Sequence, residues 1–304
     1  MILVSYLALA AAMAIVGLYV GFSKFLLAVF PVLVLAWLRF GIAGVAMAPW
    51  LRRKKGQPPL DAREKRLLFL LSFFGNFLFS ICMLSGIERS TALTAGVIMA
   101  AIPATVAVLS LWLLDEQVSP RTWAGIACAV AGIALVTLAR DADGELASGS
   151  FVGAALLFGA CVCEALYVVI GKKLSGTVSP QRISALINGW GFLLVTPLAV
   201  WQWFSRGFDP RFVPGQTWVL LALYALLASV VTVLLWMKGL QRVPASRAGV
   251  FTVFLPIAAA AVGWTFLGET FTDLQLVAFA LAIAGVVLAT WPGRGRGAET
   301  GTPP

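Results

Sequence analysis

The feature that most constrains this chain is the internal duplication of a long apolar segment. Residues 86–140 recur without a gap 153 positions later, at residues 239–293. Each copy begins as a loop, continues as an apolar helix with a central proline, and ends with an acidic break and a second apolar helix. The matched positions are Gly86 with Gly239, Arg89 with Arg242, Ala95-Gly96-Val97 with Ala248-Gly249-Val250, Pro103 with Pro256, Glu116 with Glu269, and Ala131-Gly132 with Ala284-Gly285. One apolar unit present twice predicts a duplicated membrane protein.

The composition indicates how many times this chain crosses the membrane. Hydrophobic residues make up 61% of the 304 residues and charged residues only 12%, whereas soluble domains are about 45–50% apolar and about 25% charged. A spanning helix needs about 20 residues, so the chain accommodates ten spans with short connections. We predict an all-α polytopic membrane protein. The predicted spans are 3–22, 32–50, 67–87, 92–114, 123–139, 151–170, 183–204, 218–237, 245–267 and 274–291.

The basic residues predict the orientation of these spans. Sixteen lysines and arginines are predicted on one side of the membrane and five on the other. Cytoplasmic loops are enriched in such residues, so both termini are predicted to be cytoplasmic. Five spans per half is an odd number, so the second half enters the membrane inverted. The predicted organisation is one five-helix repeat at 1–142, its inverted copy at 150–292 and a disordered polar tail at 293–304.

Charge and cysteine usage bear on which kinds of site to expect. The net charge of +9 comes from residues that act as topology signals, so no nucleic-acid partner is expected. The chain has no histidine, and its four cysteines lie in apolar runs, where core packing is favoured over metal binding or disulfides. It also has no GxxxxGKS/T loop to bind ATP. We therefore expect no cofactor, no metal and no enzymatic activity.

Short motifs recur at the ends and centres of the predicted spans. The second span carries Trp37-Leu38-Arg39-Phe40, the fourth contains Pro103 and ends at Asp115-Glu116, and the fifth closes with Ala131-Gly132-Ile133. This pattern and its second copy resemble the drug/metabolite transporter superfamily, in its ten-helix EamA-type branch. Within that branch the chain is most similar to the YddG-type exporters of aromatic amino acids and methyl viologen. The resemblance implies export across a bacterial inner (plasma) membrane, with a central cavity between the halves.

Glu164 is the only carboxylate deep inside a predicted span. It lies 14 residues into the sixth span, or roughly 21 Å at about 1.5 Å per residue. An acid inside the membrane is expensive and indicates a function, here the binding of a substrate ammonium group or of a coupling proton. The alternatives are a structural ion pair or a side chain that reaches the cytoplasmic interface. Its repeat counterpart is Val16, so this charge belongs to one half only.

Other side chains are candidates for substrate contact. Asn76 and Ser80 are spaced i, i+4, so they share a helix face and either bind a polar substrate or bond to a neighbouring helix. Four further residues offer surfaces suited to a planar or aliphatic ligand. They are Tyr19, Met99, Tyr167 and Trp236, of which Trp236 is equally suited to anchor a span end at the membrane interface.

Arg39 and two sets of small or rigid residues have structural interpretations. Arg39 lies too deep in its span to be free, and similar arginines of the resembling family look structural, so an anchoring role is favoured over substrate binding. Pro103 and Pro256 fall near mid-helix, preceded by Gly96 and Gly249, which makes these helices candidates for moving gates or for static kinks. Gly17 and Gly21 form a GxxxG pair on the first span, where close helix packing is favoured.

These features together favour a secondary transporter that exports small amphipathic metabolites, with aromatic amino acids as the expected substrates, by alternating access. The lipid bilayer and a small-molecule substrate are the expected partners, protons are a candidate coupling ion, and a monomer is expected. A passive uniporter or channel for metabolites or cationic drugs stays open, as does a structural subunit. An intramembrane enzyme is disfavoured, because the chain has no histidine, no second buried carboxylate and no GxSxG motif.

Overall fold

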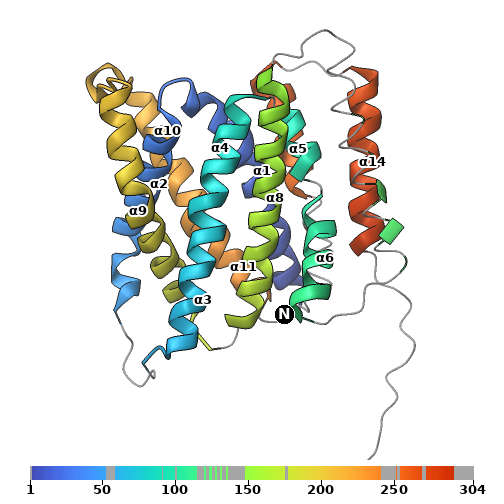
Figure 1. The fold of residues 1–304 in the computed structure, drawn as a ribbon, viewed down its shortest axis with the longest axis horizontal. Helices are drawn as coiled ribbons and strands as arrows, with labels where there is room; N and C mark the ends of the chain where they lie inside the picture. The colour runs from blue at the N-terminus through green and yellow to red at the C-terminus, as the bar shows by residue number, and fades with distance from the viewer. Residues whose placement is uncertain are drawn as a thin grey trace, which may run out of the picture.

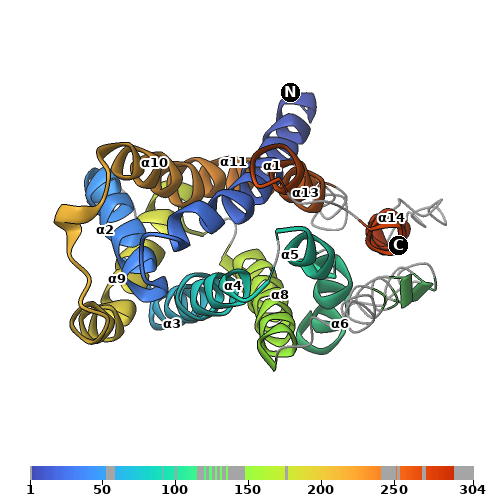
Figure 2. The ribbon, with the colours of Figure 1, turned by 90° about the horizontal axis from the view of Figure 1, so that it is seen from above.

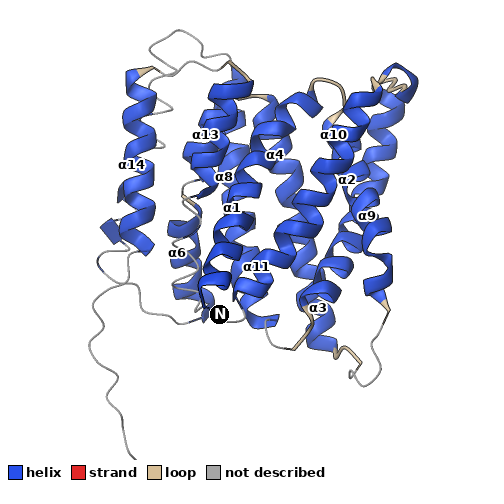
Figure 3. Ribbon diagram, turned by 180° about the vertical axis from the view of Figure 1, so that it is seen from behind, coloured by secondary structure: helices blue, strands red, loops and turns tan. Residues whose placement is uncertain are grey.

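The protein is a bundle of long apolar helices packed side by side, as Figure 1 shows. The computed structural model describes residues 2–52, 59–90, 92–99, 101–114, 120, 123–124, 127–128, 131, 135, 148–174, 177–240, 251, 254–268 and 272–290. Every element of these residues is a helix, which Figure 3 shows from the opposite side.

Six of the described helices are long and apolar enough to cross a membrane, judged by length and composition. They are Leu3–Leu27, Val32–Leu51, Ala62–Glu88, Phe151–Gly171, Pro180–Ser205 and Gly215–Gly239. Large apolar side chains such as Leu7, Val45 and Trp201 are exposed along them, as expected where lipid replaces water. The chain is therefore an all-helical polytopic membrane protein.

The helices of the two halves have the following bounds. The first half contains α1 (Ile2–Leu27), α2 (Val32–Leu51), α3 (Ala62–Ser72), η1 (Phe73–Leu78), α4 (Phe79–Glu88), α5 (Ala92–Met99) and α6 (Ile102–Leu114). The second half contains α8 (Ser148–Leu174), α9 (Pro180–Ser205), η2 (Pro210–Phe212), α10 (Gly215–Leu226), η3 (Leu227–Val231), α11 (Thr232–Leu240), α13 (Phe254–Phe266) and α14 (Asp273–Thr290). The pieces α3, η1 and α4 form one continuous span, and α10, η3 and α11 form another.

Seen from above in Figure 2, the helices form two rows. One row contains α10, α11, α1 and α13, and the other contains α9, α3, α4, α8 and α6. α2 closes one end by packing on α9 and α10, and α5 joins α13 to α8 near the other end. α14 stands at the edge, against α5 and α6. The cavity described below as the candidate site lies between the two rows.

Local sequence signals explain where the helices begin. α3 starts at Ala62, before the predicted boundary at Leu67, because a capping box precedes the apolar run. The Asp61 carboxylate accepts a hydrogen bond from the Glu64 backbone N–H at 2.6 Å, and the Glu64 carboxylate accepts one from the Asp61 N–H at 3.1 Å. α9 similarly starts at Pro180, since proline suits the first turn of a helix.

The predicted span 92–114 is described as two helices. α5 ends at Met99 and α6 begins at Ile102, so Pro103 occupies the first turn of α6, where its missing N–H leaves no helical hydrogen bond unmade. Most of the predicted span 123–139 and the start of 245–267 lie outside the described residues. The number of ten spans and the side of each terminus therefore stay predictions.

α2 and α9 are joined along their length by polar and aromatic contacts. Trp37 donates a hydrogen bond from Nε1 to Thr196 Oγ1 at 3.0 Å, and its ring stacks on Phe192 with centroids 5.5 Å apart. Nearer the start of α2, the Leu33 backbone N–H donates to Gln202 Oε1 at 2.7 Å. These contacts hold the end of the bundle that carries Arg39.

The GxxxG pair of α1 lets that helix pack closely on α13. A Cβ atom added at Gly17 would lie 2.3 Å from the Leu255 carbonyl oxygen, and one at Gly21 would lie 2.5 Å from Val262 Cβ. Real Cβ contacts are not that short, so only glycine fits at both positions. This confirms the interpretation of the pair as a packing contact.

We expect Gly17→Ala to destabilise the protein by about 1–3 kcal/mol, the usual range for overpacking. The new methyl group would meet backbone that cannot rotate away. Gly44→Ala is the matched control, since nothing lies within 4 Å of its added Cβ. Thermal unfolding of both variants in detergent measures the difference. Equal melting temperatures would contradict the close packing of α1 on α13.

Candidate functional site

A cavity with polar and aromatic walls lies between the two rows of helices. Its volume is about 70 Å³, which is room for a few water molecules, since one needs about 10–15 Å³. The lining comes from α1, α2, α8 and both three-piece spans. The lining residues are Met13, Val16, Tyr19, Arg39, Gly75, Asn76, Phe79, Glu164, Tyr167, Ala228, Ser229, Thr232, Val233 and Trp236. Five of the seven candidate contact residues are thus brought together here, namely Tyr19, Asn76, Glu164, Tyr167 and Trp236.

Two π-helical segments form part of the cavity wall. η1 contributes Gly75 and Asn76, and η3 contributes Ala228 and Ser229. A π-turn widens the helix locally and is frequent at functional sites. The backbone carbonyls of Asn76 and Ser229 also accept side-chain hydrogen bonds, from the Ser80 hydroxyl and from the Ser184 hydroxyl at 3.0 Å. Serine hydroxyls thus supplement the backbone hydrogen bonding where the helices depart from α geometry.

The cavity lining follows the internal duplication. Offsets of 148 and 153 positions, which relate the two halves, each connect pairs of lining residues. The pairs are Val16 with Glu164, Tyr19 with Tyr167, Gly75 with Ala228, Asn76 with Ser229, and Phe79 with Thr232. The two π-helices overlap under the same 153-position offset. The correspondence of these positions is visible when the 153-position alignment is extended back from Gly86. Helical periodicity alone does not predict the π-turns.

The acidic group of the cavity is Glu164, which lies on α8. The helix continues to Leu174, ten residues beyond Glu164. Its side chain is half-buried, and no hydrogen bond or ion pair reaches the carboxylate from the residues that the structure describes. Among these residues, the structural ion pair that the sequence left open is not formed. The carboxylate is therefore available to a ligand in the cavity.

Arg39 places the basic group of the cavity on α2. The residue is 5% exposed. Its guanidinium donates from Nη1 to the Tyr19 hydroxyl at 2.9 Å and from Nη2 to Ser80 Oγ at 2.7 Å. Its Cζ also lies 4.4 Å from the ring centroid of Phe40 and 5.3 Å from that of Tyr19, within the range of cation–π attraction. These contacts join α1, α2 and α4 around one buried charge.

Aromatic rings form the apolar walls of the cavity. Tyr19 packs on Tyr224 with ring centroids 4.8 Å apart. The Tyr167 ring lies against the backbone of η1, where a Cβ atom added at Gly75 would come within 2.2 Å of it. Trp236 is 5% exposed and lines the cavity, which favours a place inside the bundle over the membrane-interface anchor considered from the sequence.

Two candidate contact residues lie outside this lining. Ser80 is fully buried, and its hydroxyl is engaged by Arg39 and by the Asn76 carbonyl. Met99 is 1% exposed at the end of α5 and belongs to the hydrophobic core. For Ser80, the alternative of bonding to a neighbouring helix describes what the structure shows. The role of both residues toward a substrate stays a prediction.

The candidate gating residues are only partly described. Gly96 lies in α5, Pro103 in the first turn of α6 and Pro256 in the first turn of α13, so neither proline interrupts a described helix. Gly249 lies outside the described residues. The movement of these helices stays a prediction of the sequence.

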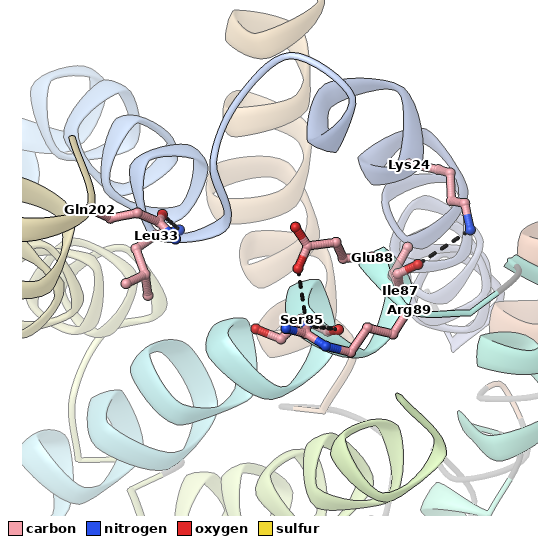
Figure 4. A network of polar contacts seen from close by, with 7 residues as sticks. All are labelled: Lys24, Leu33, Ser85, Ile87, Glu88, Arg89 and Gln202. Carbon is pink, nitrogen blue, oxygen red and sulfur yellow. Dashed lines mark hydrogen bonds and ion pairs between the residues drawn. The ribbon is translucent and has the colours of Figure 1, made fainter. Parts of the chain in front are cut away.

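Polar contacts join helix ends near the C-terminal end of α1, as Figure 4 shows. Lys24 Nζ donates to the backbone carbonyls of Ile87, at 3.3 Å, and of Ser90. Arg89 donates from Nη1 to the Ser85 carbonyl at 2.7 Å and to the Glu88 carboxylate at 3.0 Å. The lysine thus ties the end of α1 to the carbonyl end of α4, where a cation is favourable.

A second cavity, of about 280 Å³, lies at the same end of the bundle. Its polar lining residues are Glu88, Gln202 and Arg206, and the turn between α1 and α2 supplies its apolar wall. Like the cavity between the rows, it is lined by both charge signs and by aromatic rings, here those of Phe30 and Phe208.

Comparison with known proteins identifies the family. Residues 3–138 and 151–291 both match the EamA-like transporter family. The chain belongs to this family. The EamA-like chain is 33% identical over 283 residues to the uncharacterized transporter YetK of Bacillus subtilis, covering 93% of this chain and 85% of that protein. Its relatives are named transporters, which makes it a membrane transporter and implies that it is not an enzyme.

Two further similarities are weaker, one in the length that matches and the other in sequence identity. Over 144 residues the transporter is 30% identical to the threonine/homoserine exporter RhtA of Escherichia coli, covering 45% of each chain. A solved crystal structure aligns with 94% of this chain and 95% of its own, with a TM-score of 0.62 and 16% sequence identity. At that identity, the structural match shows the fold alone.

We expect Tyr19→Phe to destabilise the transporter by about 1–3 kcal/mol, the usual result of leaving a buried donor unpaired. The variant keeps the ring but removes the hydroxyl that accepts from Arg39. Tyr6→Phe is the matched control on the same helix, because no described residue bonds to the Tyr6 hydroxyl. Thermal unfolding in detergent compares them. If Tyr19→Phe melts like Tyr6→Phe, the Tyr19 hydroxyl does not hold the guanidinium.

Proposed function

We propose that this protein is a secondary transporter of the bacterial inner membrane that exports small amphipathic metabolites with an amino group, amino acids above all. The observation that carries the proposal is the Glu164 carboxylate, which lines a cavity inside the bundle and has no partner among the described residues. A carboxylate in that place suits an ammonium group. The name of the partial relative RhtA, a threonine/homoserine exporter, supports amino acids as the substrate class.

Within this class we propose aromatic amino acids, as in the YddG-type exporters that the sequence resembles. The support is the ring content of the lining, which includes Tyr19, Phe79, Tyr167 and Trp236. Aromatic walls favour a planar side chain through offset or edge-to-face contacts. The cavity of about 70 Å³ is smaller than the 300–1,000 Å³ of typical ligand pockets. Binding of such a substrate therefore requires the two rows of helices to move apart.

The proposed mechanism is alternating access between two inverted five-helix repeats. Its support is the set of five repeat-related pairs around the cavity, since a site near the repeat interface is usual in transporters of this build. If the halves exchange shapes, the site faces each compartment in turn at similar free energy. We propose that one chain is sufficient, because a single bundle encloses the cavity.

We expect Glu164→Gln to reduce substrate flux at least tenfold and to abolish its response to an imposed proton gradient. The amide keeps the shape of the side chain but cannot carry the negative charge that the ammonium group or a coupling proton would need. The flux and its gradient response are measured in proteoliposomes with a set pH difference, using radiolabelled phenylalanine, tryptophan and threonine. Glu64→Gln is the control, because this residue lies at the start of α3 and a glutamine still completes the capping box.

Each outcome of the flux experiment has a distinct meaning. Wild-type flux that does not depend on the proton gradient or on the voltage would indicate a passive uniporter or channel. Unchanged flux and gradient response in Glu164→Gln would remove Glu164 from the mechanism. An absence of flux from the purified protein for every amino acid and quaternary amine tested would overturn the proposed transport.

The inverted-repeat proposal also requires both chain ends on the cytoplasmic side, as the positive-inside rule predicts. We expect reporters that are active only in the cytoplasm to be active at either terminus, and reporters that are active only outside it to be silent at both. A reporter fused after Arg206, in the predicted outer loop between α9 and α10, is the control and should behave oppositely. Termini on different sides would exclude two five-span halves.

A further inference from the structure

The guanidinium of Arg39 has more hydrogen-bond donors than its neighbours use. Arginine carries five N–H donors, and the described residues take two of them, through Tyr19 and Ser80. Its Nε is buried without an acceptor in the described part of the chain. No described carboxylate forms an ion pair with it. A residue that is 95% buried therefore lines the cavity with an unneutralised positive charge and an unused donor.

A second unused donor lies on the same cavity. Asn76 Nδ2 is buried and has no acceptor among the described residues. One hydroxyl ties the two residues together, because Ser80 Oγ accepts from Arg39 and donates to the Asn76 backbone carbonyl. The guanidinium and the Asn76 amide are therefore held in one place by the same short stretch of η1 and α4.

Buried donors that no protein group accepts from favour a ligand that supplies acceptors. The two oxygens of a carboxylate match a guanidinium edge and an amide N–H, and the charge assists both hydrogen bonds. Glu164 lines the same cavity, and no ion pair joins it to Arg39. The cavity thus has one positive and one negative group that a single ligand can satisfy together.

We propose that Arg39 and Asn76 form a carboxylate subsite that restricts the transporter to zwitterionic amino acids and excludes amines that lack the carboxylate. The ammonium half of this pairing rests on the proposed function of Glu164. The carboxylate half rests on the unused donors alone. A bare amine or quaternary ammonium cation would leave the Arg39 charge unpaired and facing another cation, which is a repulsive element that discriminates between substrates.

Ligand-dependent thermal stabilisation of the purified transporter tests the subsite without requiring transport. Phenylalanine, tryptophan and threonine are titrated beside their amides and, for the aromatic pair, beside phenethylamine and tryptamine. A ligand that binds the folded state stabilises it by RT ln(1 + [L]/Kd), so the rise in melting temperature with ligand concentration gives the affinity. We expect each acid that binds to do so at least tenfold more tightly than its amide or amine.

Variants separate the subsite from a structural role of Arg39. Arg39→Lys keeps the charge but loses the planar fork, so we expect the acid affinity to fall about tenfold while the amide affinity stays unchanged. Asn76→Ala should likewise reduce the ratio of the acid affinity to the amide affinity. Asn188→Ala is the matched control, since this buried amide bonds to the Ser184 carbonyl and does not line the cavity. In Asn188→Ala the ratio of acid affinity to amide affinity should equal that of the wild type.

The ligand series on the wild-type protein tests the carboxylate subsite even if Arg39→Lys fails to fold. Amides and amines that bind as tightly as the acids would overturn the carboxylate subsite and leave the proposed amine-binding role of Glu164 intact. Tight binding of the acids with no change in Glu164→Gln would keep the subsite and overturn that role. Stabilisation by none of these compounds would overturn both.

Discussion

The burial of one arginine is the constraint on which the polar part of this structure depends. A guanidinium cannot lose its charge under any condition that a protein meets, and placing it inside an apolar bundle is expensive unless its donors find acceptors. Arg39 meets part of this requirement through Tyr19 on α1 and Ser80 on α4, with the faces of Tyr19 and Phe40 close to its charge, while its Nε has no acceptor among the described residues. The helices α1, α2 and α4 are therefore fixed relative to one another. Their common boundary is the wall of the cavity.

The two three-piece spans supply the rest of that wall. Lipid offers no hydrogen bonds to a helix that departs from α geometry, so such a departure persists only where other groups satisfy the backbone. The hydroxyls of Ser80 and Ser184 do this at the carbonyls of Asn76 and Ser229, which correspond to each other in the duplication. The glycine of η1 then lets the Tyr167 ring approach the backbone. Each half thus lines the cavity with a π-helix that a serine hydroxyl supports, while Arg39 and Glu164 give the cavity opposite charges that the duplication does not repeat.

Several site residues could be predicted because their signal is local or repeated. Glu164 is conspicuous as an acid in an apolar run, and Tyr19 and Tyr167 correspond to each other across the halves. Ser80 shows that spacing alone does not choose between the alternatives. Its i, i+4 spacing from Asn76 assumes α-helical periodicity, but η1 ends at Leu78, between the two residues, and changes the phase of the helix. Asn76 therefore lines the cavity, whereas Ser80 is covered and engaged by Arg39.

The sequence by itself determined the class of this protein. Long apolar runs, sparse charges and the 153-position duplication leave few alternatives to a membrane-embedded helical bundle, since each of these properties can be seen within one segment or by comparing two. Only the tertiary structure decided that Arg39 meets Tyr19 and Ser80, that Trp236 belongs to the interior, and that two π-helices shape the cavity. The physical reason is that periodicity and hydropathy report which face of a helix is buried, whereas the partner of a buried polar group depends on how separate helices pack.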